Sequence, residues 1–195
     1  MQKESKHAKY LTNNIISKQL VGNFFSEIGK LYNSIHVENI LDVGCGEGFI
    51  LNYLNSIKKI TKASAIDVDP DEIKDAKQNL PFCNVMEASA YELPFKDNEF
   101  DLVICSEVLE HLEEPEKAIQ EINRVANKYI LLSVPNEPIW RILNMARFKY
   151  WNKLGNTPGH INNWSSRQFV KIVSKYFKIN LIKKPLPWTV LLCFK

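Results

Sequence analysis

The 195-residue sequence lacks several features that mark specialised classes of protein. No apolar run approaches the length of a membrane span, and the first ten residues, MQKESKHAKY, lack the apolar stretch of a signal peptide. Internal repeats, low-complexity segments and C-x-x-C pairs are also absent. The net charge is only +3, with Lys and Arg scattered, so a nucleic-acid partner is not favoured. The four cysteines, Cys45, Cys83, Cys105 and Cys193, lie far apart, which favours reduced thiols in a cytoplasmic protein over disulfides or a zinc site.

Strand-like and helix-like segments alternate along the chain. Strands are expected at residues 40–43, 62–68, 84–86, 100–106, 129–134, 178–182 and 188–194, and helices at 11–32, 49–56, 70–79, from 115, and at 165–176. This alternation predicts a doubly wound α/β fold with a mainly parallel seven-stranded sheet. Only KKPLP separates the last two strands, which is too short for a parallel crossover, so the final strand is expected to run antiparallel.

The length predicts one domain, residues 1–195, that can be divided into four parts. These are an N-terminal helical cap (1–36), a ligand-binding core (37–135), an inserted segment (136–164), and a C-terminal helix with two strands (165–195).

Three glycines at alternate positions, Gly44, Gly46 and Gly48, stand between a strand and a helix in LDVGCGEGFI (41–50). Glycine permits positive φ and close backbone approach, and the helix N-terminus offers free N–H donors. Nineteen residues after Gly48, Asp67 ends the next strand, where a carboxylate can accept hydrogen bonds from both hydroxyls of a ribose. The pattern predicts a nucleoside ligand; a tight turn with no ligand is the alternative.

The loop departs from the dinucleotide fingerprint G-x-G-x-x-G, because the place of its third glycine is taken by Phe49. Asp42 also precedes the loop inside the strand, where its charge would repel a pyrophosphate but attract an amino or sulfonium group. An NAD-dependent dehydrogenase is therefore disfavoured.

Five stretches together resemble the class I S-adenosylmethionine (SAM) methyltransferases: LDVGCGEG, AIDVDP (65–70), LPF (93–95), FDLVICSEVLEHLEEPEKAIQEINRV (100–125) and YILLSVPNEP (129–138). The branch that includes ubiquinone and menaquinone biosynthesis enzymes is the most similar. The resemblance covers about residues 38–138 and implies a Rossmann-like fold, SAM as cofactor and S-adenosylhomocysteine as product.

The resemblance also implies a set of cofactor-binding residues. They are Asp42, Gly44, Cys45, Gly46, Asp67, Val68, Ser89, Ala90 and Ser106. Asp42 would hold the amino group of SAM, Asp67 the ribose, and Ser106 the methionine moiety. Val68 is either an adenine contact or a core valine, and Ser106 is either a ligand contact or a plain strand-end serine. Ser89 departs from the family, which often has Asp there to accept from the adenine amino group.

The run E-x-x-E-H of Glu107, Glu110 and His111 follows the fourth strand and is expected to converge on a helical turn. By resemblance to small-RNA 2′-O-methyltransferases and ubiquinone-pathway O-methyltransferases, it implies ligands for a divalent metal, with His160 as a further ligand. The alternatives are a structural role or His111 acting as a base without metal. His111 and His160 are the catalytic candidates, and no metal ligand is assigned.

In the inserted segment, Ile139, Leu143, Ala146, Tyr150 and Leu154 recur at helical spacing and predict one continuous apolar face. The segment is interpreted as a lid over an apolar or aromatic acceptor, as a packed helix or homodimer contact, or as a surface that meets lipid. Lys9, Tyr10 and Asn13 of the N-terminal helix are expected to close the same pocket.

The leading hypothesis is a SAM-dependent methyltransferase that acts on a small molecule at an O, N or C atom. A metal-dependent RNA 2′-O-methyltransferase and a non-catalytic SAM-binding subunit remain as alternatives.

Overall fold

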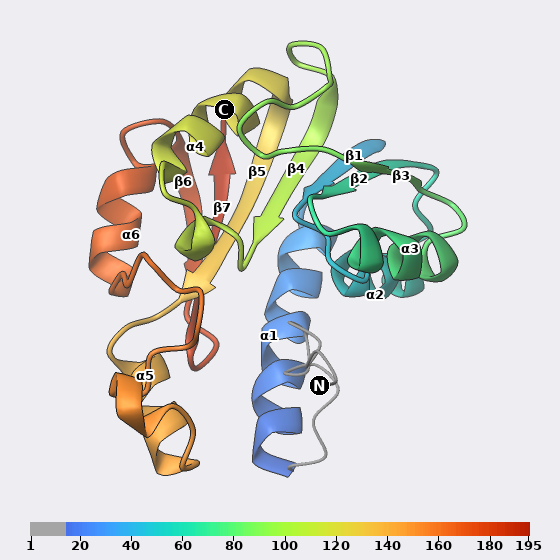
Figure 1. Cartoon of the computed structure of the whole chain (residues 1–195). Helices are drawn as coiled ribbons and strands as arrows, with labels where there is room; N and C mark the ends of the chain where they lie inside the picture. Colours follow the sequence, from blue (N-terminus) through green and yellow to red (C-terminus); the bar gives the residue numbers. More distant parts are fainter. Residues whose placement is uncertain (1–14) are drawn as a thin grey trace.

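The computed structural model describes residues 15–195, whose centre is one seven-stranded sheet (Figure 1). The strands are β1 (Asn39–Val43), β2 (Lys62–Asp67), β3 (Asn84–Glu87), β4 (Phe100–Ser106), β5 (Ala126–Pro135), β6 (Lys178–Lys183) and β7 (Trp188–Phe194). The helices are α1 (Ile15–Asn33), α2 (Phe49–Ile57), α3 (Pro70–Asn79), α4 (Pro115–Val125), α5 (Ile139–Ala146) and α6 (Ser166–Val173), with short 3-10 turns η1 (Leu109–His111) and η2 (Trp151–Lys153). The doubly wound α/β prediction is confirmed.

The strand order is β3-β2-β1-β4-β5-β7-β6. Strands β1 to β5 pair in parallel, whereas β7 is antiparallel to both β5 and β6. The expected antiparallel final strand is therefore confirmed. It follows from the short connection after β6, which leaves no length for a crossover.

Helices cover both faces of the sheet. Helices α1, α2 and α3 pack in one buried apolar cluster, and α4 and α6 pack in the other. In α1, Phe24, Ile28 and Leu31 are buried, and Leu20 packs against their cluster, as the sequence spacing predicts. Both sheet faces are therefore buried, which explains why a strand such as β4 is apolar along almost its whole length.

The winding direction reverses between β1 and β4, because β2 and β3 lie on one side of this pair and β5 to β7 on the other. In open α/β sheets, ligands bind at the carboxyl ends of the strands at this reversal. Figure 1 shows the carboxyl ends of β4 and β5 pointing toward the end of the molecule where α1 and α5 lie. The fold thus brings the glycine loop after β1 and the turn after β4 to one edge.

The inserted segment does not form the single helical stripe expected from its spacing. Helix α5 ends at Ala146, and Tyr150 and Leu154 adopt left-handed backbone conformations, with φ of 55° and 49°. A helix cannot continue through such residues. Trp140 of α5 is buried instead in the core, with its ring centroid 5.6 Å from that of Trp188.

None of the helices among residues 15–195 is both long and apolar enough to cross a membrane. All four cysteines are free thiols, and Cys45, Cys105 and Cys193 are buried. The predicted contribution of Lys9, Tyr10 and Asn13 lies outside the described residues.

Candidate functional site

The loop after β1 is fixed by its own backbone. The amides of Gly44 and Cys45 both donate to the carbonyl oxygen of Ile66, at 2.8 and 2.9 Å. Gly44 has a φ of 72°, and a Cβ there would lie 2.3 Å from Cγ2 of Val108, in the turn after β4. The glycine at this position is therefore required by the packing of the chain as well as by any ligand.

Asp67 closes the loop from the end of β2. Its Oδ2 accepts a 2.8 Å hydrogen bond from the Gly46 amide, and its Oδ1 accepts from the amides of Val68 and Asp69 at 2.7 and 3.0 Å. These bonds hold a partly exposed carboxylate at the carboxyl edge of the sheet, the place predicted for a ribose contact. The adjoining Val68 side chain is 63% exposed, so it is not a core valine.

Asp42 is a buried carboxylate inside β1, beside the loop. Its Oδ2 is buried and accepts no hydrogen bond from any residue between 15 and 195. Burial, and secondarily the charge of Asp67, raises the pKa of Asp42 from 3.8 to about 7. A buried anion of this kind is stable only with a cationic or hydrogen-bonding partner. The amino group of a methionine moiety is a partner of that chemistry, so the residues present fit the cofactor that the sequence implies.

Ser89 and Ala90 follow β3 and lie near Asp67, because the Ala88 amide donates to the Asp67 carbonyl oxygen at 3.0 Å. The Ser89 hydroxyl accepts a 3.2 Å bond from the Tyr91 amide, which fixes a local turn. Burial raises the pKa of the Cys45 thiol well above its usual range, so the thiol is protonated at neutral pH.

Ser106 ends β4, but its hydroxyl faces the neighbouring strand. Its Oγ lies 2.7 Å from Ser133 Oγ, and Ser133 Oγ in turn donates to Glu107 Oε1 at 3.1 Å. The hydroxyl of Ser106 is therefore engaged inside the sheet.

Glu107 does not converge with Glu110 and His111, which corrects the expectation for the E-x-x-E-H run. Its backbone is left-handed, with φ of 61°, and its Oε2 accepts a 2.7 Å bond from Nε1 of Trp188. This backbone conformation turns the side chain away from η1 and into the sheet network. The spacing argument assumed a regular helical turn from Glu107 onward, whereas the 3-10 turn begins only at Leu109.

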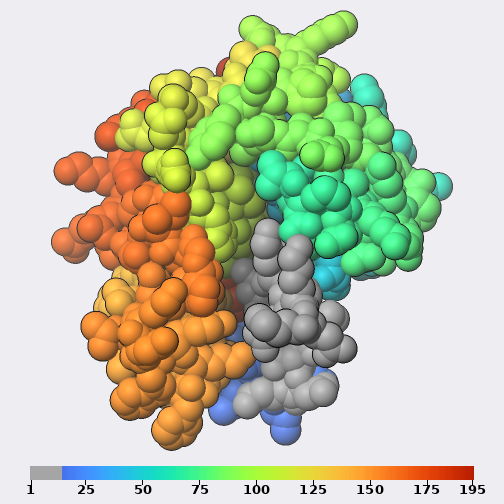
Figure 2. Space-filling model, viewed as in Figure 1, coloured from blue at the N-terminus to red at the C-terminus, as the bar shows by residue number. Residues whose placement is uncertain are grey.

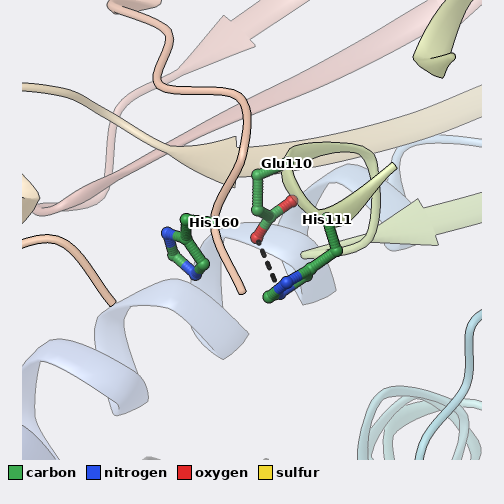
Figure 3. A group of neighbouring side chains, drawn as sticks. All are labelled: Glu110, His111 and His160. Carbon is green, nitrogen blue, oxygen red and sulfur yellow. Dashed lines mark ion pairs between the residues drawn. The ribbon is translucent and has the colours of Figure 1, made fainter. Parts of the chain in front are cut away.

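His160 takes the place expected of Glu107. Metal-binding or acid–base atoms of Glu110, His111 and His160 all lie within 4.8 Å of one another. Figure 3 shows the Glu110 carboxylate between the two imidazole rings, one from the turn after β4 and the other from the inserted segment. The carboxylate is buried, and its Oε1 lies 4.0 Å from His111 Nε2.

The tautomer of neutral His111 is set by its other ring nitrogen. His111 Nδ1 lies 3.0 Å from the carbonyl oxygen of Gly159. A carbonyl can only accept, so Nδ1 carries the proton and Nε2 presents a lone pair toward Glu110. A lone pair facing a carboxylate favours a cation between them, which is either a proton on Nε2 or a metal ion.

The inserted segment is held against η1 by a set of hydrogen bonds that no residue pattern predicts. The amides of Ile161 and Asn162 both donate to the Glu110 carbonyl oxygen, at 2.9 and 3.0 Å. The Asn162 side-chain amide also donates to the carbonyl oxygens of Leu109 and Leu112. No short-range pattern marks Asn162, because its partners lie about fifty residues earlier in the chain.

The chain is similar to known methyltransferases. Residues 41–129 match the family model described as "Methyltransferase domain". An uncharacterized methyltransferase of Schizosaccharomyces pombe is 36% identical over 101 residues, which are 45% of this chain and 36% of the relative. Norajmaline N-methyltransferase of Rauvolfia serpentina is 35% identical over 96 residues, which are 46% of this chain and 32% of the relative. Each match thus spans about a third of the relative's own length.

One similar solved structure is that of magnesium protoporphyrin IX methyltransferase from Synechocystis with bound S-adenosylhomocysteine. The TM-score is 0.69 at 18% sequence identity, and the alignment covers 97% of this chain and 92% of the Synechocystis chain. This likeness shows the fold. Together with the matched segment at residues 41–129, the glycine loop and the placement of Asp42 and Asp67, it makes the chain similar to the class I SAM-dependent methyltransferases.

Proposed function

We propose that this protein transfers a methyl group from SAM to a small-molecule acceptor, at an oxygen, nitrogen or carbon atom. The observation that carries the proposal is the buried Asp42 carboxylate, which lacks a hydrogen-bond partner on Oδ2 among residues 15–195 and stands beside the glycine loop at the reversal point of the sheet. When bound, SAM supplies an electrophilic methyl group on a sulfonium ion.

Three groups of the chain are suited to orient this cofactor. Asp42 accepts from the amino group, Asp67 accepts from the ribose hydroxyls, and exposed Val68 offers an apolar contact to the adenine ring. Because the Gly46 amide donates to Asp67, the ribose contact and the loop are held as one unit. Holding two reactants in alignment is the largest task of such an enzyme, worth about 7–11 kcal/mol of the barrier.

His111 and His160 are suited to receive a proton from the acceptor. His111 Nε2 faces the buried carboxylate of Glu110, which stabilises the imidazolium that forms. The Trp140 ring stacks near His160, with centroids 6.1 Å apart, and packs against this imidazole in the buried core. The small-molecule class is supported by the matched relative whose name specifies norajmaline as its substrate.

A divalent cation held by Glu110, His111 and His160 is the second candidate chemistry for this group. It is favoured by the lone pair that His111 Nε2 directs at the Glu110 carboxylate. Two imidazoles and one carboxylate suit Mn²⁺ or Zn²⁺ better than Mg²⁺. Calorimetric titration with each of these ions, repeated on His160→Ala, separates the candidates: saturable binding abolished by the substitution supports the cation, and its absence leaves the proton-acceptor role. The RNA 2′-O-methyltransferase alternative depends on the first outcome.

The proposal is tested by titrating the protein with S-adenosylhomocysteine and with NAD in a calorimeter. We expect tight binding of the first and none of the second. Asp67→Ala should weaken binding roughly a hundredfold, because a charge-assisted pair of hydrogen bonds is lost. Asp75→Asn, an exposed carboxylate on α3, is the matched control and should bind normally. Preference for NAD, or equal affinity of the Asp67 and Asp75 variants, would overturn the assignment.

The Asp67 side chain also holds three loop amides, so Asp67→Asn is included as a second variant. Its single amide oxygen can still accept from one side of the loop, either from Gly46 or from Val68 and Asp69, while its charge is gone. Intermediate affinity with an unchanged melting temperature would attribute the effect to ligand contact and not to collapse of the loop.

A further inference from the structure

The basic residues are not distributed evenly along the chain. The 58 residues after Glu137 contain eleven of the 25 basic residues and none of the 22 acidic ones. This part carries a charge of +11, and the preceding 137 residues carry −8. The small net charge of +3 therefore conceals two parts of opposite sign, because basic residues occur in both parts and acidic residues only in the first.

The inserted segment, which lies at the start of the basic part, also exposes large apolar side chains. Phe148 is 85% exposed, Leu154 is 67% exposed, Ile142 is 60% exposed and Trp151 is 56% exposed. Soluble monomers seldom display so many large apolar side chains within a dozen residues, so the cluster marks a contact surface. Figure 2 shows the segment as an orange lobe at the lower end of the molecule.

We call residues 147–154 the tip. It intersperses three cationic side chains, Arg147, Lys149 and Lys153, with the apolar or aromatic Phe148, Tyr150, Trp151 and Leu154. The rings of Phe148 and Trp151 stack with centroids 6.2 Å apart. Lys149 and Lys153 are exposed and form no ion pair with any residue between 15 and 195.

The tip is built to hold this arrangement. Phe148, Tyr150 and Leu154 all have positive φ, which side chains other than glycine adopt at a cost. Hydrogen bonds offset that cost: Trp151 Nε1 donates to the Met145 carbonyl oxygen at 3.0 Å, and Asn144 Nδ2 donates to the Gly155 carbonyl oxygen at 2.9 Å. Strained backbone that keeps aromatic rings in solvent is typical of a functional contact.

We propose that the tip docks on an anionic lipid surface. Exposed lysines attract acidic headgroups, while Phe, Trp, Leu and Ile side chains enter the boundary between headgroups and acyl chains. The phosphates of a nucleic acid would pair with the cationic side chains and its bases would stack on the aromatic rings. It has no apolar region, however, that would bury the aliphatic side chains of Ile142 and Leu154. The acidic remainder of the protein would be repelled by the same surface, so the charge separation also orients the molecule.

Docking in this orientation has a consequence for the site. The segment that carries the tip continues into residues 156–162, which are fastened to η1 and carry His160. A docked tip therefore brings the acceptor side of the crevice to the lipid interface. The docking itself does not rest on the proposed methyl transfer, and its test needs neither SAM nor acceptor.

The experiment is sedimentation of the full chain with phosphatidylcholine vesicles containing no or about one-third phosphatidylglycerol. We expect binding only to the anionic vesicles, with roughly a twentyfold loss for Lys149→Gln combined with Lys153→Gln. Phe148→Ser combined with Trp151→Ser should lose binding similarly while keeping the charge. Lys171→Gln combined with Lys178→Gln, exposed lysines elsewhere in the basic part, gives the same net charge as the lysine variant and should bind normally.

Trp151 supplies an independent readout, because Trp140 and Trp188 are buried and Trp164 is partly buried. Anionic vesicles should shift tryptophan emission to shorter wavelength, and Trp151→Phe should remove the shift. The proposal would be overturned by a lack of binding to anionic vesicles, or by equal losses of binding in the tip and control lysine variants. It would also be overturned if the protein bound an oligonucleotide more tightly than vesicles, in a salt-sensitive way that the Phe148→Ser and Trp151→Ser substitutions did not change.

Discussion

The indole nitrogen of Trp188 donates a 2.7 Å hydrogen bond to the carboxylate of Glu107, a residue 81 positions earlier in the chain. The bond joins the first residue after β4 to the first residue of β7. Glu107 holds a left-handed backbone and a buried side chain there, so the turn that leads to Glu110 and His111 is set by a contact in the sheet. Glu107 accordingly helps to position the turn that carries Glu110 and His111.

Removal of this carboxylate should destabilise the fold. In Glu107→Ala, Trp188 Nε1 and Ser133 Oγ lose their acceptor in a buried setting, which should lower the free energy of unfolding by about 2–3 kcal/mol. Glu107→Gln retains an oxygen that can accept from the indole and should cost about 1 kcal/mol or less. Urea denaturation of the three proteins measures both values. Equal losses in the two variants would show that the hydrogen bond to Trp188 contributes little.

Asp42 should make the stability of the free protein depend on pH. Its pKa is about 7 in the native state and 3.8 when unperturbed, so between these values the native state holds a proton that the unfolded state has released. Stability from this group is therefore fully present below pH 4 and declines as pH rises through 7. The expected decline is up to about 4 kcal/mol, and Asp42→Asn should lack it. Thermal or urea unfolding of both proteins at pH 4.5 and 7.5 measures the difference.

The same carboxylate should give cofactor affinity the opposite pH dependence. An amino group binds the ionised form of Asp42, so affinity for S-adenosylhomocysteine should rise by up to about tenfold per pH unit from pH 5 to 7 and then level off. Asp42→Asn should bind weakly and show little change over this range. A pH-independent affinity in the native protein would remove Asp42 from the cofactor site.

Local patterns were enough to predict most of the fold. The glycine loop, the buried strand β4 and the short link before β7 each depend on neighbours in sequence, so alternation and loop length gave the strand count and the antiparallel strand. The edge of the sheet that carries the glycine loop and Asp67 could also be predicted, because the loop and Asp67 follow consecutive strands. The structure agrees on where these residues lie, while their roles remain proposals.

The acceptor side could not be predicted in the same way. The Glu107 side chain is directed by Trp188 and Ser133, and His160 reaches Glu110 through a loop held by Asn162. These are contacts between distant segments, and residue spacing carries no information about them. The helical stripe through Tyr150 and Leu154 failed for a related reason, since apolar spacing does not report the left-handed backbone that ends a helix.

Substitution of His111 or His160 should lower turnover, whereas substitution of a histidine outside the site should not. With an acceptor identified by screening, His111→Ala should lower kcat by about a hundredfold or more, because the group that receives the acceptor proton is lost. The affinity for S-adenosylhomocysteine should change little. His36→Ala, at an exposed site remote from the crevice, is the matched control. Unchanged kcat in both His111→Ala and His160→Ala would assign the histidines a structural role only.

Substitution by alanine at two glycines of helix α1 should change the stability of the protein in opposite directions. Gly22 is exposed, and a Cβ there would meet no atom within 4 Å, so Gly22→Ala should stabilise the protein by about 0.5–1 kcal/mol through reduced freedom of the unfolded chain. At Gly29 a Cβ would lie 2.7 Å from Ile57 Cδ1 and 3.1 Å from the Tyr53 hydroxyl, so these two side chains of α2 would have to shift. Gly29→Ala should therefore destabilise by about 1–3 kcal/mol despite the same gain in helix propensity. Unfolding free energies of the two variants, measured side by side, test whether α1 packs against α2 at Gly29, and a stabilised Gly29→Ala variant would contradict that packing.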